Sequence, residues 1–218
     1  MTPCDCTETH VPRRIVLTGG PGAGKTATLE LIRRASFCDH VQILPEAASI
    51  VFGGGFPRRR DVEGRKAAQR AIYHVQRELE ASTAADNAAI ILCDRATVDG
   101  AAYWPGPDDY FAAVNTTLAE ELRRYDAVIH LRTPRVEGGY NHQNPLRTET
   151  AIEAAEVDLR ILRIWDTHPR RFIVDAMPDF LAKAARVLEL MRAELPECCR
   201  HHVVAEIDRS THNPPAVA

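Results

Sequence analysis

The sequence has no long apolar run, and its basic residues do not exceed its acidic ones. No apolar stretch approaches the roughly 18 residues that a membrane-spanning helix needs, and the N-terminal segment MTPCDCTETHVPRR has no apolar signal-peptide core. The 27 basic and 30 acidic residues give a net charge of −3, whereas non-specific binding to nucleic acid requires excess Lys and Arg. We therefore expect a cytoplasmic protein that acts neither on nucleic acid nor in a membrane.

The cysteines do not show the regular spacing of a secreted disulfide framework. Cys93 lies inside an apolar run and is predicted to be a buried thiol. Four cysteines lie near the two ends of the sequence, and two histidines follow those at the C-terminal end. These residues are Cys4 and Cys6 at one end, and Cys198, Cys199, His201 and His202 at the other. Adjacent pairs lack the spacing of two to four residues with which two thiolates share one zinc ion, so we interpret these residues as thiols and imidazoles of terminal segments.

Lysine is scarce. Only Lys25, Lys66 and Lys183 are lysines, which leaves 27 − 3 = 24 arginines. This bias does not by itself identify a function, but arginines near loops suit the bidentate recognition of phosphate or carboxylate. A chain of 218 residues fits one domain with a core large enough to need no disulfide or metal.

Short β-rich runs alternate with segments of helical period. Four of the five predicted strands are nearly continuous apolar runs, as in parallel strands that are covered on both faces. The predicted strands are Arg14–Leu17, Val41–Leu44, Ala89–Cys93, Ala127–Leu131 and Phe172–Val174. Three apolar helical stripes lie between or after them: Ile72, Val75 and Leu79; Ile152, Ala155, Leu159 and Leu162; Leu181, Ala185, Leu188 and Met191. Strands separated by helices predict an α/β fold with a parallel sheet.

This alternation sets the predicted domain limits: a flexible N-terminus over 1–12, one domain over 13–195, and a C-terminal tail over 196–218, where periodicity is lost.

Two loops interrupt the alternation. Phe52–Arg60 is rich in glycine and arginine, and Pro134–Arg147 is long and polar. Thr150 and Glu153 form a capping-box pattern that starts the next helix, which leaves Arg147 at the end of the second loop. Long loops in compact domains are commonly functional.

One phosphate-binding motif is complete and follows a predicted strand. It matches G-x-x-x-x-G-K-[ST] and opens a helix: Gly19, Gly20, Pro21, Gly22, Ala23, Gly24, Lys25 and Thr26, followed by Ala27. Glycines let successive backbone N–H groups converge on phosphate oxygens, and the helix N-terminus adds partial positive charge. Lys25 is placed to reach the β- and γ-phosphates and the Thr26 hydroxyl to bind magnesium. The motif predicts binding of a nucleoside triphosphate with Mg²⁺.

A second magnesium-binding carboxylate is predicted at Asp94, which ends the apolar strand AIILCD. The alternative is that Asp94 only caps the following turn.

These segments together resemble a known family. GGPGAGKT, PEAAS after the second strand and DRATVDGAAY after the third are similar to the small P-loop "AAA domain" ATPase and kinase family. That family includes the nicotinamide-riboside-kinase domain of bifunctional NAD-metabolism regulators and is related to deoxyribonucleoside and thymidylate kinases. The resemblance covers residues 13–195. It implies a three-layer P-loop fold with a five-stranded parallel sheet of order 2-3-1-4-5 and a lid loop.

The resemblance also implies roles for residues that match its motifs. Glu46 matches the acidic residue that accepts a proton from the acceptor hydroxyl. Asp94 and Arg95 match a pair in which the carboxylate serves magnesium and the arginine holds phosphate or acceptor. Arg147 matches a lid arginine that closes on the transferred phosphoryl group. Ala96 departs from the pattern, where a glycine is expected.

Each assignment has a simpler alternative. Glu46 is also compatible with a surface turn, Arg95 with an exposed ion pair to Asp99, and Arg147 with a solvated helix entry. Charge runs are usually solvated faces, and we interpret Arg58–Arg60 in this way.

The leading hypothesis is an ATP- and Mg²⁺-dependent kinase for a small molecule, with catalytic residues Lys25, Glu46, Asp94, Arg95 and Arg147. ATP is favoured because the guanine-specific N-K-x-D stretch is absent. The acceptor stays open between nucleosides, nucleotides and specialised metabolites, and the expected pocket segments are Val51–Arg60 and Gln69–Gln76. The alternative is a regulatory NTPase that switches with its nucleotide and signals to a protein partner. The oligomeric state is left open.

Overall fold

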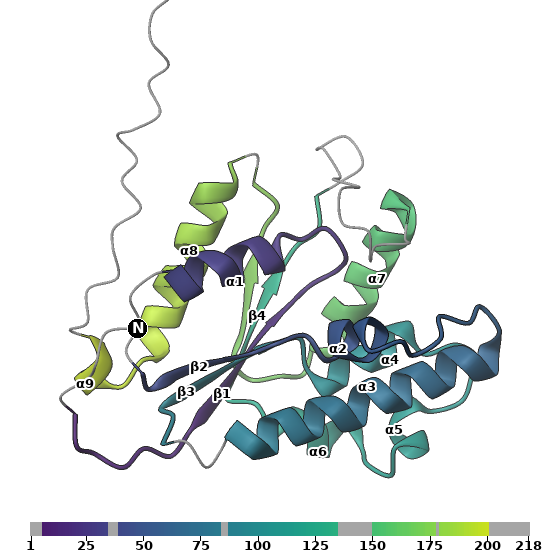
Figure 1. The fold of residues 1–218 in the computed structure, drawn as a ribbon. Helices are drawn as coiled ribbons and strands as arrows, with labels where there is room; N and C mark the ends of the chain where they lie inside the picture. The colour runs from purple at the N-terminus through teal and green to yellow at the C-terminus, as the bar shows by residue number, and fades with distance from the viewer. Residues whose placement is uncertain (1–5, 35–38, 84–86, 135–149, 178, 201–218) are drawn as a thin grey trace, which may run out of the picture.

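A five-stranded parallel sheet forms the centre of the protein (Figure 1). The computed structural model describes residues 6–34, 39–83, 87–134, 150–177 and 179–200. The strands are β1 (Arg13–Thr18), β2 (Val41–Leu44), β3 (Ile90–Asp94), β4 (Ala127–Leu131) and β5 (Arg171–Val174). They lie in the order β2-β3-β1-β4-β5, and all neighbours pair in parallel. The predicted α/β class and strand order are confirmed, and each strand boundary differs from its prediction by at most one residue.

Helices cover both faces of the sheet, so the fold has three layers. On one side Ile15 and Leu17 of β1 pack with α1 (Lys25–Arg34) and α8 (Phe180–Glu194). On the other side Val16 belongs to a core with residues of α3 (Val62–Thr83), α4 (Gly100–Tyr103) and α7 (Ala151–Ile164). Alternate residues of β1 thus enter opposite cores, as the pleat of a strand requires.

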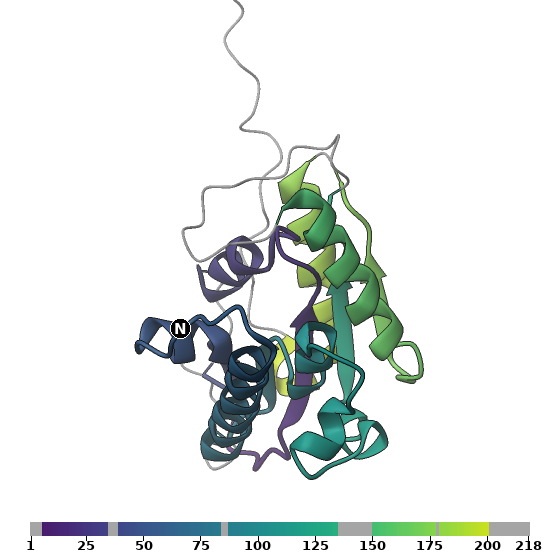
Figure 2. The same ribbon diagram turned by 90° about the vertical axis from the view of Figure 1, so that its right-hand side faces the viewer.

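Shorter elements connect these layers. α2 (Ala47–Gly53) lies against α3 (Figures 1 and 2). The others follow the sheet strands or end the described chain: η1 (Thr97–Asp99), α5 (Tyr110–Ala113), α6 (Leu118–Leu122) and α9 (Glu197–Arg200). The glycine-rich loop begins later than expected, because α2 continues to Gly53. The predicted tail begins with α9, and Cys199 in it is 2% exposed.

Hydrogen-bonding caps fix the helix starts near the sheet edge. The Thr150 hydroxyl accepts from the Glu153 N–H, and the Glu153 carboxylate accepts from the Thr150 N–H, so the predicted capping box is present at α7. Asp179 caps α8 through the Leu181 N–H. Arg147 and the rest of the predicted lid from residue 135 lie outside the described residues. Among the described helices, none combines the length and apolarity needed to cross a bilayer.

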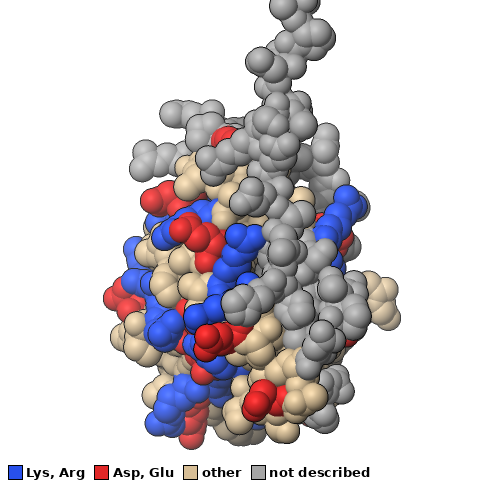
Figure 3. All heavy atoms as spheres, turned by 90° about the vertical axis from the view of Figure 1, so that its left-hand side faces the viewer, with Lys and Arg blue, Asp and Glu red and all other residues tan. Residues whose placement is uncertain are grey.

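Charges of both signs are interspersed on the face in Figure 3, as far as its atoms are described. Exposed pairs one helical turn apart, such as Glu30 with Arg33 and Arg186 with Glu189, occur along the helices. Such exposed pairs add little to stability. The fold therefore depends mainly on the two apolar cores beside the sheet.

Candidate functional site

The turn after β1 has the backbone shape of a phosphate-binding loop. Gly19 has φ 137°, and a Cβ there would lie 2.1 Å from the Leu131 carbonyl oxygen, so only glycine fits. Gly24 has φ 92° directly before α1 begins at Lys25. The Lys25 ammonium is buried and donates to the carbonyl oxygens of Gly19 at 2.8 Å and Gly20 at 2.9 Å. The loop and its lysine are therefore held as one unit.

Burial shifts the acid–base properties of this lysine. Loss of hydration, followed by the nearby positive charge of Arg95, lowers the pKa of Lys25 to about 7. The negative charges of Asp94 and Glu46 oppose the shift without cancelling it. An added anion such as a phosphate would favour the charged ammonium.

Asp94 lies beside this loop at the carboxyl end of β3, in register with Leu17 of β1. Its side chain is 8% exposed, and Oδ1 has no hydrogen-bond partner among the described residues. Burial, followed by the negative charge of Glu46, raises the pKa of Asp94 to about 6. Asp94 lines the same cavity as the exposed Thr26 at the start of α1. A buried carboxylate oxygen with no donor in such a cavity suits a magnesium ion, which prefers oxygen ligands.

Arg95 reaches back over the loop from a left-handed backbone position. Its φ is 68°, which is uncommon for a residue with a side chain. Its Nε donates to Glu46 Oε1 at 2.8 Å, and its Nη1 donates to the Gly19 carbonyl at 3.2 Å. Asp99 is more distant, at 3.8 Å from Nη1. The left-handed backbone thus places a guanidinium between the loop and Glu46.

Glu46 immediately precedes α2 and faces this guanidinium. Burial acts to raise the pKa of Glu46, but the charge of Arg95 and a 2.5 Å hydrogen bond from the Ser49 hydroxyl outweigh it, and the net pKa is lowered. The carboxylate is therefore ionised near neutral pH. The structure brings Glu46, Asp94, Arg95 and Lys25 together.

Sequence comparison decides the family. The AAA domain family matches residues 14–183, which is well over half of the chain. The chain belongs to this family. No curated protein matches it.

Solved structures show that this AAA domain has a P-loop kinase-like fold. A deoxyadenosine kinase from M. mycoides with bound dATP has a TM-score of 0.55 at 15% identity, over 82% of this chain and 98% of that one. A NadR protein in complex with NAD and AMP-PNP has a TM-score of 0.57 at 14% identity, over 84% of this chain. The match covers 49% of the NadR chain, so this AAA domain spans about half of that protein.

Sequence reasoning did not identify Asp158, which braces the loop of this AAA domain from α7. Asp158 Oδ1 accepts from the Gly20 N–H at 2.9 Å and lies 2.9 Å from His130 Nε2, while Oδ2 accepts from Arg132 Nε at 2.8 Å. The apolar stripe predicted for α7 does not face the core, because Ile152 is 66% exposed. The buried face is Ala154, Val157, Asp158 and Ile161. An acidic residue beside apolar neighbours at helical spacing was the available signal.

Lys183 was also missed. This residue of α8 is 3% exposed and donates to the carbonyls of Ala23 at 2.8 Å and Arg132 at 2.7 Å. Burial lowers the pKa of Lys183 to about 8. Two of the three lysines therefore lie buried against the P-loop. An ammonium carries three N–H donors on one compact atom, whereas a guanidinium spreads its donors over a planar fork.

Asp99 is a structural connection. Its Oδ2 accepts from the Thr18 hydroxyl at 2.5 Å and its Oδ1 from Trp165 Nε1 at 2.7 Å. It thereby joins β1 to the end of α7.

A cavity of about 550 Å³ opens next to these groups. Lys25, Thr26, Glu46, Asp94 and Arg95 all line it. The rest of its lining comes from α2, the following loop, α3 and α4, and includes Phe52, Arg58, Arg59, Arg60, Arg65 and Tyr103. The predicted pocket segments therefore both contribute, through Phe52 with Arg58–Arg60 and through Gln69, Ile72 and Gln76.

Proposed function

We propose that this protein transfers the γ-phosphoryl group of ATP, with Mg²⁺, to a small-molecule acceptor. The observation that carries the proposal is one cavity in which the P-loop lysine faces an ionised carboxylate held by an arginine. A nucleotide-binding site alone needs the loop and the lysine. A carboxylate in the same cavity is the additional group that proton removal from an acceptor requires.

The residues divide the reaction between them. Loop N–H groups and Lys25 hold the phosphates, and Arg95 neutralises charge on the group in transfer. Glu46 accepts the hydroxyl proton as the acceptor oxygen bonds to phosphorus and the bond to ADP breaks. Thr26 and Asp94 would hold Mg²⁺, which neutralises phosphate charge when bound. Arg147 remains a proposed lid residue that adds positive charge.

The lining arginines Arg58, Arg59 and Arg60 favour an acceptor that carries a phosphate or carboxylate. Arg58 lies 3.9 Å over the Phe52 ring, and among described residues no carboxylate pairs with Arg58 or Arg60. Arg59 pairs with Asp61 at 2.8 Å. Guanidinium groups that line a cavity and lack acidic partners are suited to binding an anion. This arrangement gives the arginine run a role beyond the solvated face that its sequence suggests.

ADP release from ATP and Mg²⁺ tests the proposal. We expect a large rate increase with one acceptor pool from a set that separates neutral nucleosides, nucleoside monophosphates and carboxylated metabolites, and we expect an anionic pool to respond. A response to neutral nucleosides alone would contradict the anionic acceptor but keep the kinase. A slow rate that no pool changes would overturn the kinase and favour the nucleotide switch.

A matched pair of variants tests the role of the cavity arginines. Arg60→Ala should raise the KM for the active acceptor about 10-fold, because charge-assisted hydrogen bonds of this kind are worth roughly that factor or more, and should leave the KM for ATP unchanged. Arg123→Ala, an exposed arginine outside the cavity, is the control. Equal effects of the two variants would remove the acceptor role of Arg60.

A further inference from the structure

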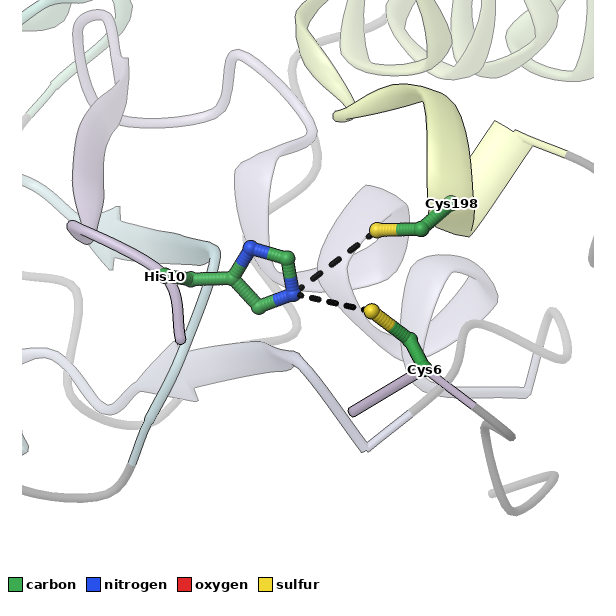
Figure 4. A group of neighbouring side chains, drawn as sticks. All are labelled: Cys6, His10 and Cys198. Atoms are coloured by element: carbon green, nitrogen blue, oxygen red, sulfur yellow. Dashed lines mark hydrogen bonds between the residues drawn. The ribbon is translucent and has the colours of Figure 1, made fainter. Parts of the chain in front are cut away.

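The N-terminal segment and the C-terminal helix α9 meet at the edge of the sheet opposite the P-loop. Cys6 and His10 precede β1, and Cys198 belongs to α9. One ligand atom from each of the three lies within 4.8 Å of the other two (Figure 4). Because residues of this edge precede the strands, it is the amino edge, whereas Lys25 and Asp94 follow strands at the carboxyl edge.

The separations between the three atoms match those of ligands around one ion. Cys6 Sγ lies 3.6 Å and Cys198 Sγ 3.7 Å from His10 Nε2. A tetrahedral zinc ion with Zn–S of about 2.3 Å and Zn–N of about 2.0 Å places neighbouring sulfur and nitrogen ligands about 3.5 Å apart. In Figure 4 both sulfur atoms point toward the same ring nitrogen. The nitrogen and the two sulfur atoms therefore already lie at the separations expected for three ligands of one tetrahedral ion.

Neighbouring residues hold this set in place. The His10 N–H donates to Asn87 Oδ1 at 2.9 Å, and Asn87 Nδ2 donates to the Glu8 carbonyl at 3.3 Å. The His10 ring packs edge-on against His40, 4.6 Å between centroids. Cys199 Sγ, in turn, lies 3.6 Å from His40 Nδ1. These contacts position the backbone and the ring of His10, and outer contacts that orient a ligand are typical of metal sites.

We propose that Cys6, His10 and Cys198 bind one Zn²⁺ ion that joins the N-terminal segment to α9. Two thiolates and an imidazole suit zinc and exclude hard ions such as Mg²⁺ and Ca²⁺. Each thiol releases a proton to solvent on binding, so two protons leave per ion. The fourth position belongs to solvent or to Cys199, whose Sγ lies 3.7 Å from that of Cys198.

The proposal revises our interpretation of the terminal thiols. Ligand spacing along the sequence does not reveal a site whose donors come from both ends of the chain, 188 residues apart between His10 and Cys198. The site is also independent of phosphoryl transfer, because it lies at the opposite edge of the sheet. Its effect is on folding, since an ion bound only by the folded chain stabilises it.

Zinc content and thermal unfolding of the full reduced chain test the site. After loading with ZnSO4 and desalting, we expect one zinc per chain by elemental analysis, and a lower Tm after chelation. Cys6→Ala and Cys198→Ala should each weaken zinc binding at least about 100-fold, more than loss of an outer partner does. Co²⁺ in place of zinc should give visible tetrahedral and thiolate charge-transfer bands in the wild type and lose them in both variants.

Two control variants separate this site from other effects. Cys93→Ala removes a buried thiol of β3 and should keep one zinc. His74→Ala removes an exposed imidazole of α3 and should keep both zinc and Tm.

Three results would overturn the proposal: no bound zinc in the folded reduced wild type, full zinc retention by Cys6→Ala and Cys198→Ala, or a Cys6–Cys198 disulfide after purification under reducing conditions. The disulfide would appear as an intact mass two hydrogens low together with a cross-linked peptide that contains both cysteines.

Discussion

The two edges of the sheet differ in how their polar groups are balanced. At the carboxyl edge four charged residues lie close together: Lys25, Asp94, Glu46 and Arg95. Burial lowers the pKa of Lys25 and raises the pKa of Asp94, so it favours the neutral form of each. At the amino edge the groups are thiols and imidazoles, and each lies at a ligand-like distance from the next. The carboxyl edge therefore suits a charged ligand that binds and dissociates. The amino edge suits a metal ion that stays bound.

The largest expected effect is a loss of phosphoryl transfer, without a loss of stability, when Lys25 at the carboxyl edge is replaced. Lys25→Ala should lower phosphoryl transfer at least about 1000-fold, because it removes the cation beside the transferred group. Zinc content and Tm should remain close to those of the wild type. Lys66→Ala, a lysine that pairs with Asp108 outside the cavity, should retain activity within about 3-fold. Undiminished turnover of Lys25→Ala would show that this loop is not the catalytic site.

Asp158→Ala should lower the free energy of unfolding by about 3 kcal/mol, because it leaves the buried His130 ring, the partly buried Arg132 guanidinium and the Gly20 N–H without their carboxylate. Urea unfolding measures this loss. Glu156→Ala, an exposed residue of the same helix, should change stability by less than about 0.5 kcal/mol. Equal losses in the two variants would mean that Asp158 does not brace the loop.

Glu46→Gln sharpens the comparison within the cavity. It should lower kcat about 100-fold, because an amide does not accept the acceptor proton, and should leave the Kd for ATP within about 3-fold. Steady-state kinetics with nucleotide titration measures both quantities. Glu63→Gln, at an exposed position of α3, is the control. A matching loss of ATP affinity would instead make Glu46 structural or a magnesium ligand.

Asp94→Asn should stabilise the protein by about 1 to 3 kcal/mol at pH 8. The pKa of Asp94 is raised from 3.8 to about 6, so the folded state disfavours its charge above pH 6, and two pKa units correspond to about 3 kcal/mol. The advantage should fade as the pH falls from 6 toward 4, where the wild-type carboxyl becomes protonated. Urea unfolding at pH 8 and pH 4.5 checks this, and a stability gain equal at both pH values would contradict it.

Much of the sheet and the loop was predictable from local sequence, and the braces around them were not. β3 and β4 are largely apolar runs that are buried along their whole length, and β1 is buried from Ile15 onward. The P-loop turn needs glycine at Gly19 and Gly24, which have positive φ. The helical faces were harder to predict, because the buried side of α3 carries Tyr73, Gln76 and Glu80. Gln76 and the hydroxyl of Tyr125 donate to Glu80.

Asp158 and Lys183 were missed for the same reason. Polar groups enter a core when distant parts of the chain supply hydrogen-bond partners, and one segment read alone does not show those partners.

The two distant contacts that hold the P-loop also affect when, during synthesis, the protein can bind nucleotide. Gly20 is held by Asp158, 138 residues later, and Ala23 by Lys183, 160 residues later. Contacts over such separations form late, because the intervening chain must first be closed into a loop. When synthesis has reached only the end of β4, the nascent chain contains every glycine of the P-loop but neither Asp158 nor Lys183. Nucleotide binding during synthesis should therefore begin only when α8 has emerged.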